Sequence, residues 1–128
     1  PSYDLPVQSP RQEIPHEGPE KIYYDTGGLR SISFLKNGKR EGPQKTYYAS
    51  GVLWREYFYR NGSLEGEAKT YYESGALHAQ EEYKEGKAVG VHKYYYEDGT
   101  LESECSYGEH YRERRFDKSG KLVNEVVY

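Results

Sequence analysis

The chain has 128 residues, a net charge of −3 and 16 tyrosines, which bring the aromatic fraction to 16%. Its single cysteine, Cys105, excludes an intramolecular disulfide, and no apolar run approaches the ~18 residues of a membrane span. The mild acidity, with Lys and Arg spread evenly, argues against a nucleic-acid surface. The aromatic content predicts a folded chain that packs tyrosine where most domains pack leucine.

Residues 1–17 contain four of the six prolines and no periodic apolar pattern. This composition predicts a flexible, Pro-rich tether. The chain starts at Pro1 and contains no methionine, which indicates processing or trimming. The compartment therefore stays open: cytoplasmic, or periplasmic or at the cell surface if a signal segment was removed before Pro1.

From residue 18 onward the sequence repeats every 24 residues. Each unit starts with a glycine: Gly18, Gly42, Gly66 and Gly90. Each then carries a tyrosine pair: Tyr23–Tyr24, Tyr47–Tyr48, Tyr71–Tyr72 and Tyr95–Tyr96. A fixed period of this length predicts a repeat array. The predicted domain covers 18–128, with repeats 18–41, 42–65, 66–89 and 90–113 and a truncated fifth copy, 114–128, as a cap.

Each repeat is expected to contain two strands and two turns. The run Lys69–Tyr72 has strand-forming residues, and the loop that follows places Gly75 where a three-residue hairpin needs positive φ. A second turn is signalled by Asn37-Gly38 and Asn61-Gly62. The sequence thus predicts an all-β, elongated, single-layer antiparallel β-meander of ten short strands.

Strict alternation places Tyr23, Leu29 and Leu35 on one face of this sheet, and Arg30 and Phe34 on the other. The leucine face repeats almost unchanged, so it is the predicted core side. The opposite face varies between repeats and is the predicted recognition surface. A two-residue turn would exchange the faces.

The Tyr-Tyr-x-x-Gly-x-Leu core and the Tyr59-Arg60-Asn61-Gly62 turn resemble the MORN (membrane occupation and recognition nexus) repeat in its bacterial second-type form. The chain is similar in this respect to the YwqK-type antitoxin family. The resemblance covers about residues 18–128. It implies an elongated antiparallel sheet that binds proteins or lipids, and bacterial relatives are thought to neutralise a co-encoded toxin by binding it. It implies no catalytic residues.

The titratable residues do not suggest an active site. The histidines are scattered, without metal-ligand spacing, and are expected to be solvated: His16, His78, His92 and His110. Glu102 and Glu104 are expected to share a face, but a thin sheet offers little burial to shift a carboxyl pKa. We therefore expect no enzyme activity, no metal ion and no cofactor.

Trp54 and Phe58 flank Glu56 and are expected to form an aromatic patch if their face is open. Such residues are enriched at binding hot spots, and the alternative is that the two rings pack over the backbone of the sheet itself. Six residues are predicted to contact a partner: Trp54, Phe58, Phe34, Tyr48, Tyr72 and His78. A lysine ladder also recurs in the repeats: Lys21, Lys45, Lys69 and Lys93. It would attract anionic headgroups or an acidic protein, or serve only as solubilising charge.

These features predict a non-catalytic protein-binding repeat scaffold, of the antitoxin or immunity type that neutralises a partner by binding. The expected partner is another protein, with a co-encoded toxin as one candidate and nucleic acid excluded. Two alternatives remain: a membrane or lipid-headgroup binding platform, and a structural surface protein.

Overall fold

The computed structural model describes residues 17–128; the prediction of a tether at the N-terminus concerns residues that lie almost entirely outside this range. The described residues form a single sheet of thirteen strands and no helix. The longer strands are β1 (Gly18–Tyr23), β2 (Leu29–Lys36), β4 (Gly42–Tyr47), β5 (Leu53–Arg60), β7 (Gly66–Tyr71), β8 (Leu77–Lys84), β10 (Gly90–Tyr95), β11 (Leu101–Tyr107), β12 (Arg112–Phe116) and β13 (Leu122–Val127). The short ones are β3 (Lys39–Arg40), β6 (Ser63–Leu64) and β9 (Lys87–Ala88).

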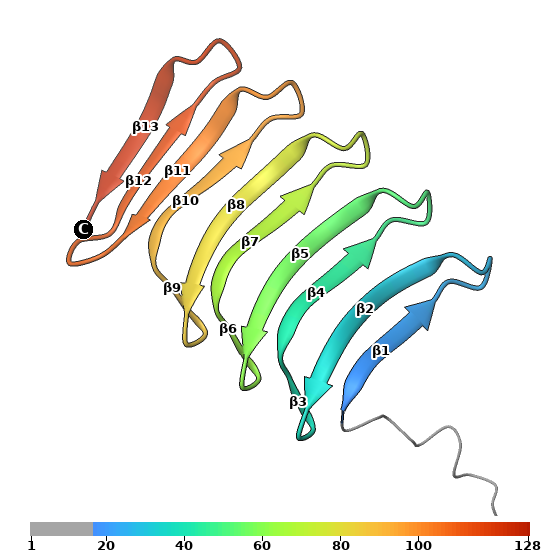
Figure 1. Cartoon of the computed structure of the whole chain (residues 1–128). Helices are drawn as coiled ribbons and strands as arrows, with labels where there is room; N and C mark the ends of the chain where they lie inside the picture. The colour runs from blue at the N-terminus through green and yellow to red at the C-terminus, as the bar shows by residue number, and fades with distance from the viewer. Residues whose placement is uncertain (1–16) are drawn as a thin grey trace, which may run out of the picture.

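The ten longer strands pair in chain order, each antiparallel to the next, and make one open layer (Figure 1). This arrangement confirms the predicted single-layer meander. The three two-residue strands were not predicted: each folds back on the strand before it and pairs with its last residues. Among residues 17–128 there is no helix of the length and hydropathy that crossing a membrane requires.

The hairpin inside each repeat closes as the glycine pattern predicts. The Gly75 amide donates to the Tyr72 carbonyl at 2.8 Å, and the Tyr72 amide to the Ala76 carbonyl at 2.9 Å. Gly75 has a φ of 94°, which a residue with a Cβ adopts only at a cost. The same pair of bonds recurs in all five hairpins, so the three-residue loop with a bulge is confirmed.

The Asn-Gly turn also forms as expected. Asn61 and Gly62 have φ values of 51° and 85°, the two positive values of a type I′ turn. Each turn is tied to the preceding repeat, because the Asn61 amide donates to the Glu41 carboxylate at 2.9 Å and the Gly62 amide to the Arg40 carbonyl at 2.9 Å. These bonds hold successive turns in a row at one end of the strands.

A bulge beside each hairpin inverts the alternation of side chains. Ile22 pairs with Ser31, whereas the next residue, Tyr23, pairs with Leu29. Paired residues share a face and consecutive residues do not, so Leu29 and Ser31 lie on opposite faces although they are two residues apart. The predicted faces are therefore wrong beyond the bulge: Phe34 shares the face of Leu29, and Leu35 lies opposite.

We call the two sides of the sheet the lysine face, which carries Lys21, Lys45, Lys69 and Lys93, and the histidine face, which carries His92. The repeated leucines lie half-buried on the lysine face. All five side chains that are buried among residues 17–128 lie instead on the histidine face: Ser33, Ala68, Ala79, His92 and Cys105. The expectation that the leucine face is the core side is therefore wrong.

The burial has a local cause on the histidine face. There a tyrosine pairs across the strands with a glycine, as Tyr83 does with Gly66 and Tyr107 with Gly90. A ring opposite a glycine spreads over the backbone and over the small side chains beside it. The core is consequently a thin layer of tyrosine rings on one face of an otherwise open sheet.

Candidate interaction surfaces

The second tyrosine of each pair fastens its repeat to the next one. The Tyr48 hydroxyl donates to the Tyr71 carbonyl at 2.6 Å, and the Tyr72 hydroxyl to the Tyr95 carbonyl at 2.6 Å. Tyr24 and Tyr96 make the equivalent bonds at 2.5 and 2.9 Å. We call these four bonds the tyrosine clasps. Burial raises the pKa of Tyr48 and of Tyr72, so both hydroxyls keep the proton that the clasp requires.

In the first three repeats the clasped ring supports a side chain that differs between repeats. Trp54 stacks on Tyr48 with ring centroids 5.4 Å apart, and His78 stacks on Tyr72 at 4.2 Å. In the first repeat the Arg30 guanidinium lies 5.7 Å from the centroid of the Tyr24 ring. The fourth repeat has Glu102 at the corresponding position. Four of the six predicted contact residues thus lie together on the histidine face: Tyr48, Trp54, Tyr72 and His78.

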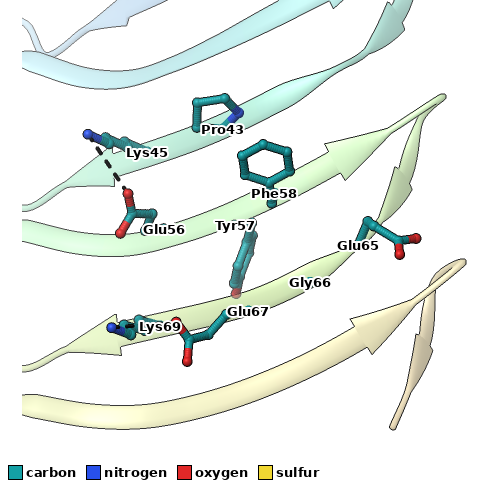
Figure 2. A pocket seen from close by; sticks show the side chains of 9 residues that line it. All are labelled: Pro43, Lys45, Glu56, Tyr57, Phe58, Glu65, Gly66, Glu67 and Lys69. Atoms are coloured by element: carbon teal, nitrogen blue, oxygen red, sulfur yellow. Dashed lines mark ion pairs between the residues drawn. The ribbon is translucent and has the colours of Figure 1, made fainter.

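The other two, Phe34 and Phe58, lie on the lysine face. Phe58 pairs with Pro43 across the strands and is 48% exposed (Figure 2). Trp54 is the extra residue of the bulge between the Tyr47–Leu53 and Thr46–Arg55 pairs, so it points away from Phe58. The expected Trp54–Phe58 patch is therefore wrong. Partner contact by the six residues stays a prediction.

The four lysines form a straight row across the sheet. Lys21 pairs with Ile32, which pairs in turn with Lys45, and the same register continues through the remaining repeats. The row reads Lys21, Ile32, Lys45, Glu56, Lys69, Gln80, Lys93 and Glu104. The geometric part of the lysine-ladder prediction is confirmed. Two of the lysines have acidic neighbours, Lys45 with Glu56 at 3.8 Å and Lys69 with Glu67 at 3.6 Å (Figure 2).

Two shallow hollows lie side by side on the lysine face. Pro43 and Lys45 lie between them and line both. The larger measures about 560 Å³ and is lined by Pro43, Lys45, Glu56, Tyr57, Phe58, Glu65, Gly66, Glu67 and Lys69 (Figure 2). The smaller measures about 330 Å³ and is lined by Lys21, Leu29, Ile32, Phe34, Pro43, Lys45 and Tyr47.

The histidine face contains a buried polar cluster that sequence reasoning missed. His92 is 1% exposed and lies between Tyr83 and Tyr107, with ring centroids 5.5 and 4.7 Å away, so its expected solvation is wrong. The hydroxyls of Tyr94 and Tyr83 both donate to the Glu81 carboxylate, at 2.8 and 3.2 Å. Burial, reinforced by Glu81, raises the pKa of Tyr83 to about 12 and also raises the pKa of Tyr94 above its ordinary value.

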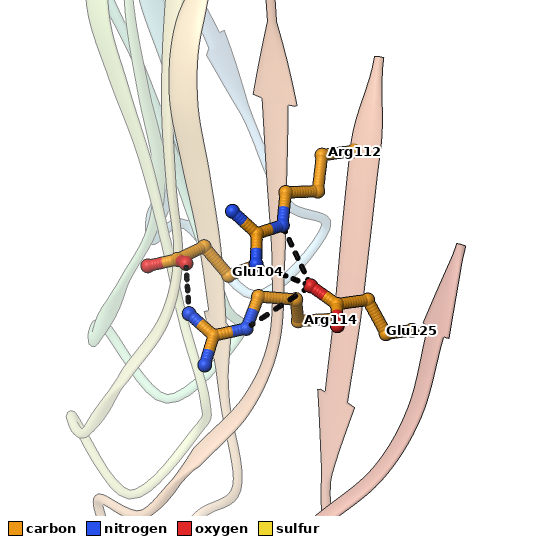
Figure 3. Close-up of polar contacts among 4 residues, drawn as sticks. All are labelled: Glu104, Arg112, Arg114 and Glu125. Atoms are coloured by element: carbon orange, nitrogen blue, oxygen red, sulfur yellow. Dashed lines mark hydrogen bonds and ion pairs between the residues drawn. The ribbon is translucent and has the colours of Figure 1, made fainter. Parts of the chain in front are cut away.

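A second polar cluster joins the last strands. The Arg112 guanidinium donates to the Glu125 carboxylate at 2.6 Å, and Arg114 lies 3.6 Å from Glu104 (Figure 3). Glu104 is on the lysine face, since it pairs with Lys93, whereas the bulge turns Glu102 to the other face. Their expected shared face is therefore wrong. Within residues 17–128 no three His, Cys, Asp or Glu side chains are grouped as metal ligands would be.

Identical hairpins, tied to one another at a 24-residue period by clasps and turn bonds, define a β-repeat scaffold. The model of the MORN repeat variant matches residues 17–37, 40–61, 64–85 and 88–108, together more than half of the chain. The chain therefore belongs to the MORN repeat variant family, whose repeats generally form non-catalytic scaffolds for protein or membrane binding. The fifth copy, from residue 114, lies beyond the matched residues.

Comparison with whole proteins adds little. No curated protein matches the chain. Among solved structures, it is similar to a chain in the crystal structure of accessory secretory protein 1, 2 and 3 in Streptococcus pneumoniae, with 17% sequence identity and a TM-score of 0.45. The match covers 84% of this chain and 20% of that chain, so this chain spans about a fifth of the other's length.

Proposed function

We propose that the chain is a non-catalytic protein-binding scaffold of the antitoxin or immunity type, and that the partner contacts the histidine face at the clasped tyrosines. The observation that carries the proposal is the pairing of a constant ring with a changing neighbour. The neighbour is Arg30, Trp54 or His78 in the first three repeats, and Glu102 occupies the same sequence position in the fourth. A frame that stays fixed while one side chain per repeat varies is the arrangement by which repeat proteins recognise partners.

The second of these positions has the composition of a binding hot spot. Trp54 is held between the Tyr48 ring and the Arg55 guanidinium, which lies 4.0 Å from the indole centroid. Tryptophan, tyrosine and arginine are the residues most enriched at hot spots. Because the indole is already held in place, a partner that binds it orders little additional side-chain freedom.

Neutralisation by binding requires no chemistry from the scaffold. A rigid sheet that covers the working surface of a toxin blocks it sterically, and affinity alone sets the degree of inhibition. The proposal of a toxin as partner is supported by the resemblance to the YwqK-type family. The mixed charge along these positions, with Arg30 and the neighbouring Arg55 in the first half and Glu102 in the second, favours a partner of opposite polarity.

The experiment is co-purification of the tagged chain with the product of the neighbouring gene, using two variants matched by face. Trp54→Ala/His78→Ala alters the histidine face, and Phe34→Ala/Phe58→Ala alters the lysine face. The proposal expects the wild type and the lysine-face variant to retain the partner and the histidine-face variant to lose it. Equal retention by both folded variants contradicts the assigned surface, and failure of the wild type to bind contradicts the antitoxin role.

Membrane binding is a second candidate, favoured by one observation. The turns of the first two repeats expose Lys36, Lys39, Arg40 and Arg60, and none of them forms an ion pair with another residue in 17–128. Clustered cations attract anionic lipid surfaces. This candidate expects salt-sensitive sedimentation with phosphatidylserine vesicles that Lys36→Gln/Lys39→Gln abolishes; no sedimentation of the wild type rules it out.

A further inference from the structure

The smaller hollow on the lysine face, over β1, β2 and β4, combines two lysines with an apolar floor. Its floor consists of Leu29, Ile32, Phe34, Pro43 and Tyr47, and Lys21 and Lys45 stand at its sides. The described residues that line it include no carboxylate. The larger hollow, over the next repeat, has the same lysine spacing but contains Glu56 and Glu67.

One position explains this difference. The residue that follows each lysine in the row is Ile32 in the first repeat and Glu56, Gln80 and Glu104 in the others. Glu56 lies 3.8 Å from Lys45. Lys21, by contrast, forms no ion pair with any residue from 17 to 128. The first repeat is thus where the row offers cationic charge beside apolar surface.

We propose that this hollow docks an extended, acidic, proline-containing segment of a partner protein, in which two acidic residues three positions apart contact Lys21 and Lys45. The residues between them pack on Ile32, Phe34 and Tyr47. The charge of the hollow selects carboxylates, and its aromatic and aliphatic floor accepts proline rings, as aromatic grooves do in other proline-recognition modules.

The spacing of the lysines selects the conformation of the segment. Lys21 and Lys45 lie two strands apart, which corresponds to about 9.6 Å at ~4.8 Å per strand. A polyproline II helix advances about 9.3 Å in three residues and returns to the same side. In a β-strand, a residue three positions further along the chain points to the opposite side. An α-helix needs seven residues and about 10.5 Å, and its diameter of ~10 Å exceeds so shallow a hollow.

The two proposals are independent because they concern opposite faces of the sheet. The histidine-face variant Trp54→Ala/His78→Ala leaves the hollow unchanged, and changes in the hollow leave the clasped tyrosines unchanged. Either proposal can therefore fail alone.

The test uses a fluorescein-labelled peptide of four Glu-Pro-Pro units and measures its anisotropy with the full chain at low salt. A control peptide has the same composition, with two adjacent glutamates at each end, so that no two glutamates lie three positions apart. The three-residue spacing is expected to give saturable binding, and the control peptide to bind about tenfold more weakly because only one glutamate at a time reaches a lysine with the prolines in place.

Protein variants locate the site. Lys21→Gln/Lys45→Gln is expected to weaken binding about tenfold, whereas Lys36→Gln/Lys39→Gln, with the same loss of charge at the turn, changes it less than twofold. Ile32→Glu places a carboxylate between the lysines and is expected to abolish binding. Since later repeats carry glutamate at this position, this variant keeps the fold. Glu56→Ile is expected to strengthen binding by extending the carboxylate-free surface.

Several results would overturn the proposal. One is equal binding of the two peptides, which would indicate that the spacing of the glutamates does not affect affinity. Another is an equal loss of peptide binding in the two lysine double variants, which would indicate that the net charge of the chain alone attracts the peptide. Absence of peptide binding by a folded chain, or Ile32-dependent binding of single-stranded DNA or polygalacturonate in place of the peptide, would exclude an acidic polypeptide as the occupant.

Discussion

Adjacent glycines in the first hairpin loop, Gly27 and Gly28, make different demands on the backbone. Gly27 has a φ of 99°, while Gly28 lies outside the left-handed region, and no atom lies within 4 Å of the Cβ position of either. Space is therefore equal at the two sites, and only backbone conformation distinguishes them.

We expect Gly27→Ala to lower the free energy of unfolding by about 1–2 kcal/mol, the cost of placing an L-residue in the left-handed region. Gly28→Ala should be neutral or stabilise by up to about 1 kcal/mol, because it restricts the unfolded chain. Urea unfolding followed by circular dichroism measures both. Equal destabilisation by the two variants would show that the positive φ of Gly27 does not determine the cost.

The raised pKa of Tyr83, about 12, makes stability sensitive to alkali. The unfolded chain loses this proton near pH 10 and the folded chain near pH 12, so folding retains it. The contribution is fully present below pH 10 and is lost as the pH rises from 10 to 12. Urea midpoints across this range should fall less steeply for Tyr83→Phe than for the wild type. Parallel curves would mean that Tyr83 ionises as freely in the sheet as in water.

At the scale of the element, the contact between repeats depends on the tyrosine clasp. Tyr72→Phe removes the hydroxyl that donates to the Tyr95 carbonyl and is expected to cost about 1 kcal/mol. Tyr71→Phe is the matched control, since the Tyr71 hydroxyl makes no hydrogen bond with any described residue and the Tyr71 carbonyl remains. Chemical denaturation compares the two. If Tyr71→Phe and Tyr72→Phe lower the free energy of unfolding equally, the clasp does not contribute to stability.

The turns could be predicted because each depends on residues within the loop itself. Gly75 and Asn61 reveal their positive φ through residue type, and the 24-residue period reveals how often each turn recurs. The faces could not be predicted in full. The bulge adds one residue to one strand only, which an alternating pattern does not record, and so Trp54 and Phe58 were assigned to the same face.

The burial of His92 depends on residues distant in sequence. Tyr83 and Tyr107 enclose it from two other strands, and a histidine in a polar run gives no sign of them. The signal available was its place in the repeat: His92 occupies the position of Ala68, which is also buried, two residues after a unit-starting glycine. Alignment of the repeats by position links His92 to Ala68, but the same position holds the half-buried Glu20 and Gln44 in the first two repeats.

At the scale of the whole molecule, the ten longer strands pair with one another only as neighbours in chain order. Perturbations several strands apart therefore share no partner. We expect Gly27→Ala and Gly99→Ala, in the first and fourth hairpins, to lower the free energy of unfolding additively within about 0.5 kcal/mol. A double-mutant cycle from urea denaturation measures the sum. A coupling energy above about 1 kcal/mol would contradict nearest-neighbour behaviour.

The seam between two repeats is joined differently from the hairpin within one. Strands β1 and β2 pair over six positions, whereas β2 and β4 pair over two, Ser31 with Thr46 and Ile32 with Lys45. Beyond that short ladder, a clasp closes each seam at one end of the strands, and in the first two seams a turn bond closes it at the other. Adding or removing a whole unit breaks no contact inside any other unit. Successive repeats are therefore spaced by about 9.6 Å, the width of two strands. Insertion or deletion of 24 residues changes the length of the array by one such step and leaves the spacing of the remaining repeats unchanged.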